Sequence, residues 1–417
     1  MEREEQKNML MLGEANRCLM CKKPRCKEHC PIGTPIPEVI NLYKEGKLNE
    51  AGEILFNNNP LSVVCSIVCP HEDQCRGFCI KGIKDEPIRF HEIENEISKK
   101  YLNEIKFNKA DKEKDMVAIV GAGPAGITIA LILAQRGYKV TIFDMHEKIG
   151  GVLRYGIPEY RLPNSMIDTI EEKLLQLDVK IRPNTLIGPV VTLDNLFNDG
   201  YKSIFIGTGV WNPKKLNIKG ETLGNVHYAI DYLKSPEVYN SGERVAVIGA
   251  GNVAMDAARV AKRGGAKEVY VLYRKGEEDM PATKDEIREA KEDNVLFKHF
   301  VAPVEIVEDG VKLVKTENVI DEGGRISTKI LNGQEEFFKC DSVIIAVSQE
   351  PKTNIVANTT KLETNKWGLI VTDDKGHTTK EGVFSSGDVV TGAKTVVEAV
   401  ANAKIVADAM DEYCQNS

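Results

Sequence analysis

The chain contains 417 residues, of which 42% are hydrophobic and 28% are charged, as in ordinary soluble proteins of roughly two to four domains. Its formal net charge of −7 excludes a broad basic surface for nucleic acid or anionic lipid. No apolar run approaches the roughly 20 residues of a membrane span, and no apolar signal core follows the charged N-terminal segment. We therefore expect a cytoplasmic protein with reduced thiols and no nucleic-acid or membrane partner.

Eight of the ten cysteines lie in two short runs near the N-terminus. The runs read Cys18-x2-Cys21-x4-Cys26-x3-Cys30-Pro31 and Cys65-x3-Cys69-Pro70-x4-Cys75-x3-Cys79. A thiolate run that closes on Cys-Pro is typical of ferredoxin-like iron–sulfur proteins, although the middle gap of the first run is longer here. Structural zinc favours two short cysteine pairs, and only one Cys-x-x-Cys is present. Disulfides need an oxidising compartment, so the pattern favours iron–sulfur clusters over both alternatives.

The cysteine runs predict a helical iron–sulfur domain over residues 1–105. One of its helices should open at Pro35 to Pro37, where apolar residues begin to recur at helical spacing. The charged segment over residues 106–115 is predicted to be a linker. From residue 116 onward the pattern changes to strand, glycine turn and helix, and it does so twice.

The first glycine unit follows a strand that begins at Val117 and leads into a helix over 127–136. A second strand, 139–143, ends at Asp144, where an acid can bond a ribose hydroxyl. Strand, glycine turn, helix and acid in this order form the dinucleotide-binding fingerprint, whose helix N-terminus faces a pyrophosphate. The predicted cofactor contacts in the turn are Gly121, Gly123, Pro124, Ala125 and Gly126.

The second glycine unit follows the strand that begins at Arg244 and has Ala254 in place of the third glycine. Its next strand ends at Arg274 and Lys275, where the first unit has an acid. Adjacent cations attract a 2′-phosphate, so this unit should prefer NADPH, unless the two charges are merely solvated at a strand end. The predicted contacts are Gly249, Gly251, Asn252, Val253, Arg274 and Lys275.

The C-terminal segment supports FAD as the cofactor of the first unit. A short strand runs into Gly387 and Asp388, whose carboxylate can accept from a ribityl hydroxyl, and a helix starts at Thr395 that can face the flavin ring. Because this segment follows the second unit, the sequence predicts an FAD domain over 116–220 and 348–417. An NAD(P)H domain over 221–347 is inserted within it. The fold class is α/β, with two Rossmann-like domains behind a helical iron–sulfur domain.

No side chain is expected to act as a catalytic acid, base or nucleophile. The flavin and nicotinamide regions contain only Cys340 and Cys414, and so lack the Cys-x-x-Cys of a redox disulfide. Hydride transfer between two cofactors needs orientation from the protein, and no proton carrier.

Taken together, these motifs resemble the family that contains the glutamate synthase small (beta) subunit and the N-terminal half of dihydropyrimidine dehydrogenase. The resemblance covers essentially the whole chain. Besides the two cysteine runs, its most specific segments are Gly150 to Pro163, Gly251 to Asp256 and Gly387 to Val390. It implies FAD contacts at Gly150, Gly151 and Arg161.

The same resemblance implies two 4Fe–4S clusters, each of which takes ligands from both cysteine runs. The first would be held by Cys18, Cys21, Cys26 and Cys79. The second would be held by Cys30, Cys69, Cys75 and a side chain on the helix after Pro87. This fourth ligand is Gln or Glu in the family, and counting from Pro87 places it at Glu94, with Glu92 and Glu96 nearby. Cys65 is left as a buried thiol outside both ligand sets.

The resemblance implies an electron-input subunit that oxidises NADPH, reduces FAD and passes single electrons through the clusters to a larger catalytic partner subunit. The leading hypothesis is a glutamate synthase small subunit. Alternatives are the input subunit of an NAD(P)-dependent dihydropyrimidine dehydrogenase and a bifurcating transhydrogenase-like flavoprotein. A hypothesis of another class is that the cysteine region binds structural metal and serves only as an interaction module.

Overall fold

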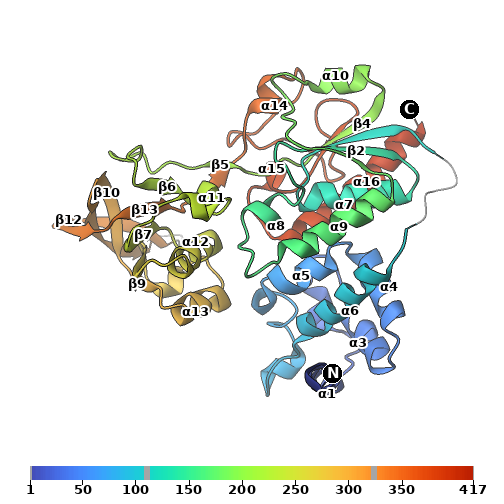
Figure 1. Ribbon diagram of the computed structural model, residues 1–417, viewed down its shortest axis with the longest axis horizontal. Helices are drawn as coiled ribbons and strands as arrows, with labels where there is room; N and C mark the ends of the chain where they lie inside the picture. Colours follow the sequence, from blue (N-terminus) through green and yellow to red (C-terminus); the bar gives the residue numbers. More distant parts are fainter. Residues whose placement is uncertain (1, 108–112, 321–325, 417) are drawn as a thin grey trace. The chain divides into compact units, whose positions relative to one another are not determined.

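The computed structural model describes residues 2–107, 113–320 and 326–416, and it divides into two compact units. The first unit comprises Met1–Arg154, Glu159–Val210 and Pro351–Ser417, and the second comprises Tyr155–Pro158 and Trp211–Glu350. The chain thus leaves the first unit and returns to it near its end (Figure 1). The predicted linker 106–115 lies partly outside the described residues, at 108–112.

The cysteine region of the first unit is helical, as expected. Helix α3 carries Pro37 in its first turn, where the missing amide hydrogen costs nothing, and it buries Val39 and Ile40 on one face. Helix α6 contributes Ile93 and Ile97 to the same core. The helices are α1 (Glu2–Asn16), α2 (Arg25–Glu28), α3 (Ile36–Lys44), α4 (Leu48–Asn58), α5 (Ser62–Val68) and α6 (Phe90–Glu104), with short 3₁₀ turns η1 (His71–Asp73) and η2 (Ile80–Ile83).

The rest of the first unit is built on a parallel five-stranded sheet of order β15-β4-β1-β2-β3. Strand β15 comes from the returning C-terminal segment, and its Phe384 pairs with Phe205 of β4. This pairing completes the sheet across the insertion, in agreement with the predicted fold class. The strands are β1 (Met116–Val120), β2 (Lys139–Phe143), β3 (Lys180–Arg182), β4 (Tyr201–Ile206) and β15 (Val383–Ser385).

Helices line this sheet, and α7, α9 and α16 lie side by side along it (Figure 1). The expected helix over 127–136 begins earlier, because Pro124 starts α7 with its fixed backbone angle at the first helical position. The helices of this part are α7 (Pro124–Gln135), α8 (Val152–Tyr155), α9 (Asn164–Gln176), α10 (Leu193–Asn198), α14 (Asn354–Ala357), α15 (Asp388–Thr391) and α16 (Val396–Asn416).

The second unit repeats the parallel arrangement with a sheet of order β6-β13-β7-β8-β9. Its strands are β6 (Val226–Tyr228), β7 (Arg244–Ile248), β8 (Glu268–Leu272), β9 (Leu296–Lys298) and β13 (Ser342–Ile345), and its helices are α11 (Ala229–Tyr232), α12 (Asn252–Arg263) and α13 (Lys284–Glu292). An antiparallel sheet of β10 (Val301–Val307), β11 (Gly310–Ile320) and β12 (Ile326–Lys339) is added, and β5 (Asn212–Pro213) pairs with β14 (Gln349–Glu350). Short 3₁₀ turns η3 (Pro236–Val238) and η4 (Glu277–Asp279) complete the unit.

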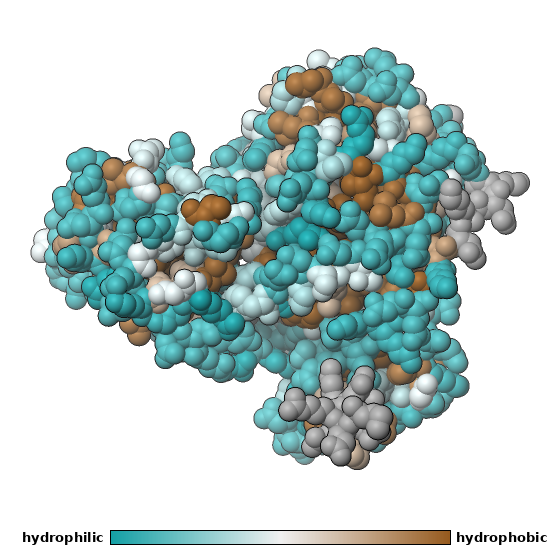
Figure 2. All heavy atoms as spheres, in the orientation of Figure 1, coloured by the Kyte–Doolittle hydropathy of each residue, from teal (hydrophilic) through white to brown (hydrophobic). Residues whose placement is uncertain are grey.

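The face shown in Figure 2 is mainly hydrophilic, with hydrophobic residues gathered in separate small areas. Across the part of the chain that the structure describes, no helix is long and apolar enough to cross a membrane.

Candidate functional site

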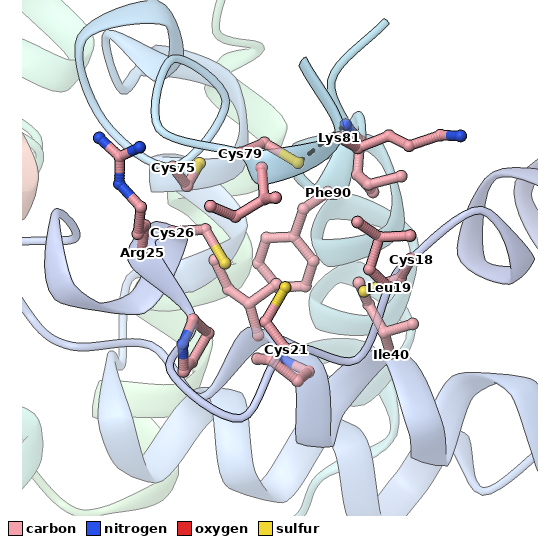
Figure 3. Close-up of a pocket in the computed structure, with 15 residues that line it drawn as sticks. Cys18, Leu19, Cys21, Arg25, Cys26, Ile40, Cys75, Cys79, Lys81 and Phe90 are labelled. Carbon is pink, nitrogen blue, oxygen red and sulfur yellow. Dashed lines mark hydrogen bonds between the residues drawn. The ribbon is translucent and has the colours of Figure 1, made fainter. Parts of the chain in front are cut away.

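Thiols from both cysteine runs surround one pocket in the helical region (Figure 3). Cys18 and Cys21 follow the end of α1, Cys26 lies on α2, and Cys79 comes from the second run, just before η2. Apolar side chains, among them Ile40 of α3, form most of the remaining wall, and Arg25 and Lys81 also line it. The four predicted ligands of the first cluster are therefore brought together.

The thiols surround a cavity and do not converge on a single point. Within residues 2–107, 113–320 and 326–416, no three His, Cys, Asp or Glu side chains meet as ligands of one metal ion. Burial raises the pKa of Cys18, and it raises that of Cys26 to about 11, so that the bare thiols resist ionisation. Bound iron reverses this preference, because a metal's charge stabilises the thiolate. The four predicted ligands, with Cys75 beside them, surround a mainly apolar cavity, which fits a polynuclear iron–sulfur cluster.

The predicted ligands of the second cluster form a neighbouring group. Burial raises the pKa of Cys75, and the charges of Glu94 and Cys30 add to this effect. A hydrogen bond with the Cys65 side chain raises the pKa of Cys69, together with burial and the charge of Glu94. Cys75 also lines the pocket of the first group, so it lies between the two sets.

Glu94 is distinguished from the other two acids considered for the fourth ligand. Glu92 bonds the exposed guanidinium of Arg89 at 2.9 Å, and Glu96 accepts from the Tyr43 hydroxyl at 3.0 Å. Glu94 instead lies on the buried face of α6, only 7% exposed, with Ser62 Oγ 2.7 Å from its Oε1. Burial raises the pKa of Glu94 to about 7, and the Ser62 hydrogen bond opposes that shift.

The glycine turn after β1 forms an open cradle at the start of α7. Gly121 has φ +106°, and a side chain there would meet the carbonyl oxygen of Gly207 at 2.5 Å. A side chain on Gly126 would meet the carbonyl oxygen of Gly121 at 1.9 Å, which explains the need for glycine at both positions. A side chain on Gly123 would meet no atom within 4 Å, so this side of the backbone is open to a phosphate. This cradle fits the pyrophosphate of a dinucleotide cofactor.

Asp144, Gly150 and Gly151, three further residues predicted to contact FAD, adjoin this cradle, and the fourth, Arg161, lies elsewhere in the first unit. Asp144 Oδ2 accepts from the Ala122 amide at 2.6 Å, which holds the carboxylate beside the turn. The Gly150 amide donates to the Ala122 carbonyl at 2.8 Å, and Gly151 packs so closely that a side chain would meet Gly123 Cα at 2.8 Å. Arg161 is half-buried between α8 and α9, where its charge acts on His71 of η1.

The C-terminal segment reaches the same turn. Gly387 has φ +76°, and a side chain there would touch the Ala125 side chain at 3.4 Å. Burial raises the pKa of the adjacent Asp388 to about 6, and the Lys394 amide, which donates to its Oδ1 at 3.2 Å, opposes the shift. Thr395 caps α16 through reciprocal bonds with Glu398.

The second glycine turn, in the second unit, has the same construction. Gly249 has φ +127°, and a side chain there would meet the Ala346 carbonyl oxygen at 2.2 Å. A side chain on Gly251 would meet nothing closer than Pro281 Cγ at 4.0 Å, which leaves the turn open. Asn252 begins α12, and its Oδ1 accepts from the Thr283 amide at 3.0 Å, while Val253 occupies the next position of the helix.

The two cations expected to select NADPH follow β8 directly. Arg274 is exposed, and its carbonyl oxygen accepts from the Thr316 hydroxyl at 2.8 Å, which holds the backbone in place. Lys275 Nζ donates to the carbonyl oxygen of Ile326 at 3.0 Å. The guanidinium is thus presented to solvent at the end of a strand, as recognition of a phosphate requires.

Two serines and a histidine that belong to no sequence motif support these sites. Ser62 and Ser98 contact each other and Glu94 in the helical region. The spacing of Glu94 and Ser98, four residues apart on an otherwise apolar helix face, is the signal that could have indicated them. His146 holds Asp144, since its backbone amide donates to Asp144 Oδ1 at 2.8 Å.

Two families match the chain in its two parts. The pyridine nucleotide-disulphide oxidoreductase family matches residues 115–403. The dihydropyrimidine dehydrogenase domain II, 4Fe-4S cluster, matches residues 2–105, the segment that contains both cysteine runs.

Curated relatives match over nearly the whole chain. The glutamate synthase (NADPH) small chain of Escherichia coli K12 is 32% identical, over 97% of this chain and 91% of the relative. The beta subunit of the NADP(+)-dependent formate dehydrogenase of Moorella thermoacetica is 33% identical, over 93% of this chain and 59% of the relative. Among solved structures, Mycobacterium tuberculosis FprA in complex with NADPH aligns with a TM-score of 0.62 at 19% identity, over 73% of this chain and 85% of that one, and so shares the fold.

Proposed function

This chain belongs to the family of the glutamate synthase (NADPH) small chains, flavin and iron–sulfur oxidoreductases that use NADPH, and on that premise we propose that it is an electron-input subunit. In this role it takes reducing equivalents from NADPH and delivers them to a larger catalytic partner subunit. The reduced thiols that cluster assembly requires support a cytoplasmic location.

The observation that carries this proposal is the pocket bounded by thiols from two separate runs. Cys18, Cys21 and Cys26 meet Cys79 there, although Cys79 lies more than 50 residues further along the chain. The neighbouring group of Cys30, Cys69, Cys75 and Glu94 supports a second cluster. Both groups lie in the same compact unit as the open glycine turn of β1 and α7.

The chain's own residues bind and orient the cofactors. When bound, FAD accepts a hydride from NADPH and the clusters carry its electrons singly. Gly121, Gly123 and Gly126 admit the pyrophosphate to the α7 N-terminus, and Asp144 accepts from a ribose hydroxyl. Asp388 accepts from the ribityl chain. No side chain in this assignment exchanges a proton with the substrate.

In the second unit, the turn at Gly249 and Gly251 receives the pyrophosphate of NADPH at the start of α12. Arg274 and Lys275 bind its 2′-phosphate through charge-assisted hydrogen bonds. Lys275 donates one of its three ammonium hydrogens to the Ile326 carbonyl and can offer the others to the phosphate, whereas Arg274 is exposed.

The acceptor is proposed to be a glutamate synthase large-subunit-like protein. A second candidate function is that of an electron-input subunit for another catalytic chain. The match to a formate dehydrogenase beta subunit supports this alternative. Dihydropyrimidine dehydrogenase and bifurcating transhydrogenase assemblies are further acceptors of this kind, the former supported by the family that matches residues 2–105.

Anaerobic purification from the native host tests the proposal. The protein should be brown and contain about eight irons and eight sulfides with about one FAD per chain, and NADPH should bleach the flavin absorbance. A large subunit that co-purifies identifies the acceptor. One or two zinc ions in a protein without sulfide would instead support a structural-metal interaction module, and would reject electron transfer.

A further inference from the structure

A buried chain of hydroxyl and carboxyl groups joins α5 to α6 behind the proposed ligand Glu94. Ser62 Oγ lies 2.7 Å from Glu94 Oε1 and 2.8 Å from Ser98 Oγ. The three residues are 2%, 7% and 6% exposed, respectively. At this depth water cannot readily replace a lost partner, so each hydrogen bond constrains the groups that it joins.

The chemistry of the groups determines the direction of the hydrogen bonds. An ionised Glu94 can only accept hydrogen bonds, so the Ser62 hydroxyl must donate its hydrogen to Oε1. Ser62 can then only accept from Ser98, which must donate. A serine inside a helix commonly bonds the carbonyl four residues earlier, but Ser98 reaches across to Ser62 instead. The relay therefore runs from Ser98 through Ser62 to Glu94.

The hydrogen bond from Ser62 engages Oε1 of Glu94 and leaves Oε2 available to bind a metal. Within the described residues, Oε2 makes no hydrogen bond, and Glu94 interacts electrostatically with the thiols of Cys69 and Cys75. A carboxylate that binds iron through one oxygen needs its other oxygen held, because outer hydrogen bonds set the orientation and donor strength of a ligand.

We propose that Ser62 and Ser98 are positioning residues that orient Glu94 as an iron ligand and set the reduction potential of the second cluster. The inference rests on the proposed function, because it takes Glu94 as a ligand. The Ser62 hydrogen bond withdraws electron density from the carboxylate, so the ligand donates less strongly to iron. The relay therefore favours the reduced cluster and raises its potential.

The test is an anaerobic redox titration of the full-length holoprotein, followed by electron paramagnetic resonance. Ser62→Ala should shift the midpoint potential of one cluster to a more negative value and change its g-values. The other cluster and the iron and sulfide contents should stay as in the wild type. Ser98→Ala should give a smaller shift in the same direction, because Ser62 still donates to Glu94 but loses the Ser98 hydroxyl that donates to it and orients it.

Ser66→Ala is the matched control. Ser66 lies on the same helix and is 2% exposed, but its hydroxyl donates to the Val63 carbonyl at 2.8 Å and accepts from Asn95 at 2.9 Å. This variant should leave both potentials unchanged. Ser62→Thr retains a hydroxyl and should restore the wild-type potential. Loss of the second cluster in Ser62→Ala, but not in Ser62→Thr, supports the same role.

An unchanged potential in Ser62→Ala, with both clusters intact, overturns the relay. Glu94→Ala separates this failure from failure of the ligand assignment. If Glu94→Ala alters the resonance of one cluster while Ser62→Ala does not, only the relay is rejected. If Glu94→Ala leaves both resonances unchanged, Glu94 is no ligand, and the relay fails together with that part of the proposed function.

Discussion

Lys404 donates a hydrogen bond from Nζ to the carbonyl oxygen of Asn58 at 2.6 Å, and a second to that of Asn57 at 3.3 Å. Lys404 belongs to α16, the last helix beside the nucleotide-binding sheet, and Asn58 ends α4 of the cysteine region. A cation at the C-terminus of a helix satisfies free carbonyls and the negative end of the helix dipole. This contact joins the C-terminal helix to the cysteine region within one compact unit.

Replacing Lys404 should loosen this junction. We expect Lys404→Met to lower the free energy of unfolding by about 1–2 kcal/mol, because carbonyls at the end of α4 lose a charged donor. Anaerobic thermal unfolding should show a Tm lower by a few degrees. Lys375→Met is the control, since its partner Glu412 on α16 is also exposed and such pairs contribute less than about 1 kcal/mol. Equal losses in the two variants would contradict the role of Lys404.

The cysteine assignments predict different results for the partly buried Cys26 and the buried Cys65. Cys26→Ala should reduce iron from about eight to about four per chain, because the first cluster loses one of its four thiolates. Cys65→Ala should keep about eight irons, because Cys65 belongs to neither ligand set although it bonds Cys69. Iron and sulfide analysis of anaerobically purified protein measures both. A loss of iron from Cys65→Ala would show that the ligand sets are wrong.

The glycine turn of the first unit predicts a contrast between two alanine variants. Gly123→Ala should fold within about 0.5 kcal/mol of the wild type, since no atom lies within 4 Å of the new methyl group, but it should bind FAD at least roughly tenfold more weakly. Gly126→Ala should destabilise the fold itself, because its methyl group would lie 1.9 Å from the Gly121 carbonyl oxygen. Thermal unfolding and the FAD content released on denaturation distinguish the two. Normal FAD binding by Gly123→Ala would reject the cradle.

The charge pair after β8 predicts which nicotinamide cofactor is used. Replacing Arg274 and Lys275 by Glu should raise KM for NADPH by roughly 10- to 100-fold and change KM for NADH much less, because only NADPH carries the 2′-phosphate. Dye reduction with either cofactor measures this ratio. Lys267→Gln, which removes an exposed cation paired with Glu243, should alter neither KM. Equal losses for both cofactors in the double variant would argue against a phosphate site.

The raised pKa of Asp388 predicts a pH dependence of FAD binding. The carboxyl is mostly neutral below its pKa of about 6 and ionised above it. An ionised carboxylate accepts a stronger hydrogen bond from a ribityl hydroxyl, so FAD affinity should rise by up to roughly tenfold from about pH 5 to pH 7.5. Asp388→Asn should bind FAD with an affinity that does not change over this range. Fluorescence titration of the flavin-free protein measures both, and a flat wild-type profile would count against this contact.

Several features could be predicted from local sequence because they depend on local chemistry. Gly121 and Gly249 must accept positive φ angles where a strand turns into a helix, and short-range periodicity alone locates those strands and helices. The density of thiols between residues 18 and 79 likewise indicates an iron–sulfur domain whatever its fold. The amino-acid sequence thus determined the fold class, the two nucleotide-binding turns and the kind of metal chemistry.

Tertiary structure alone decided which distant residues meet. Spacing within a run could not place Cys79 in one pocket with Cys18, or Gly387 against Ala125, because these contacts depend on how helices and strands pack across long stretches of chain. Counting from Pro87 pointed to Glu94, but it could not show how Glu94 differs in burial and hydrogen bonding from Glu92 and Glu96 on the same helix. Only the packing of α5 against α6 buries Glu94 and gives it the Ser62 hydroxyl, since burial and hydrogen-bond partners are properties of the folded chain.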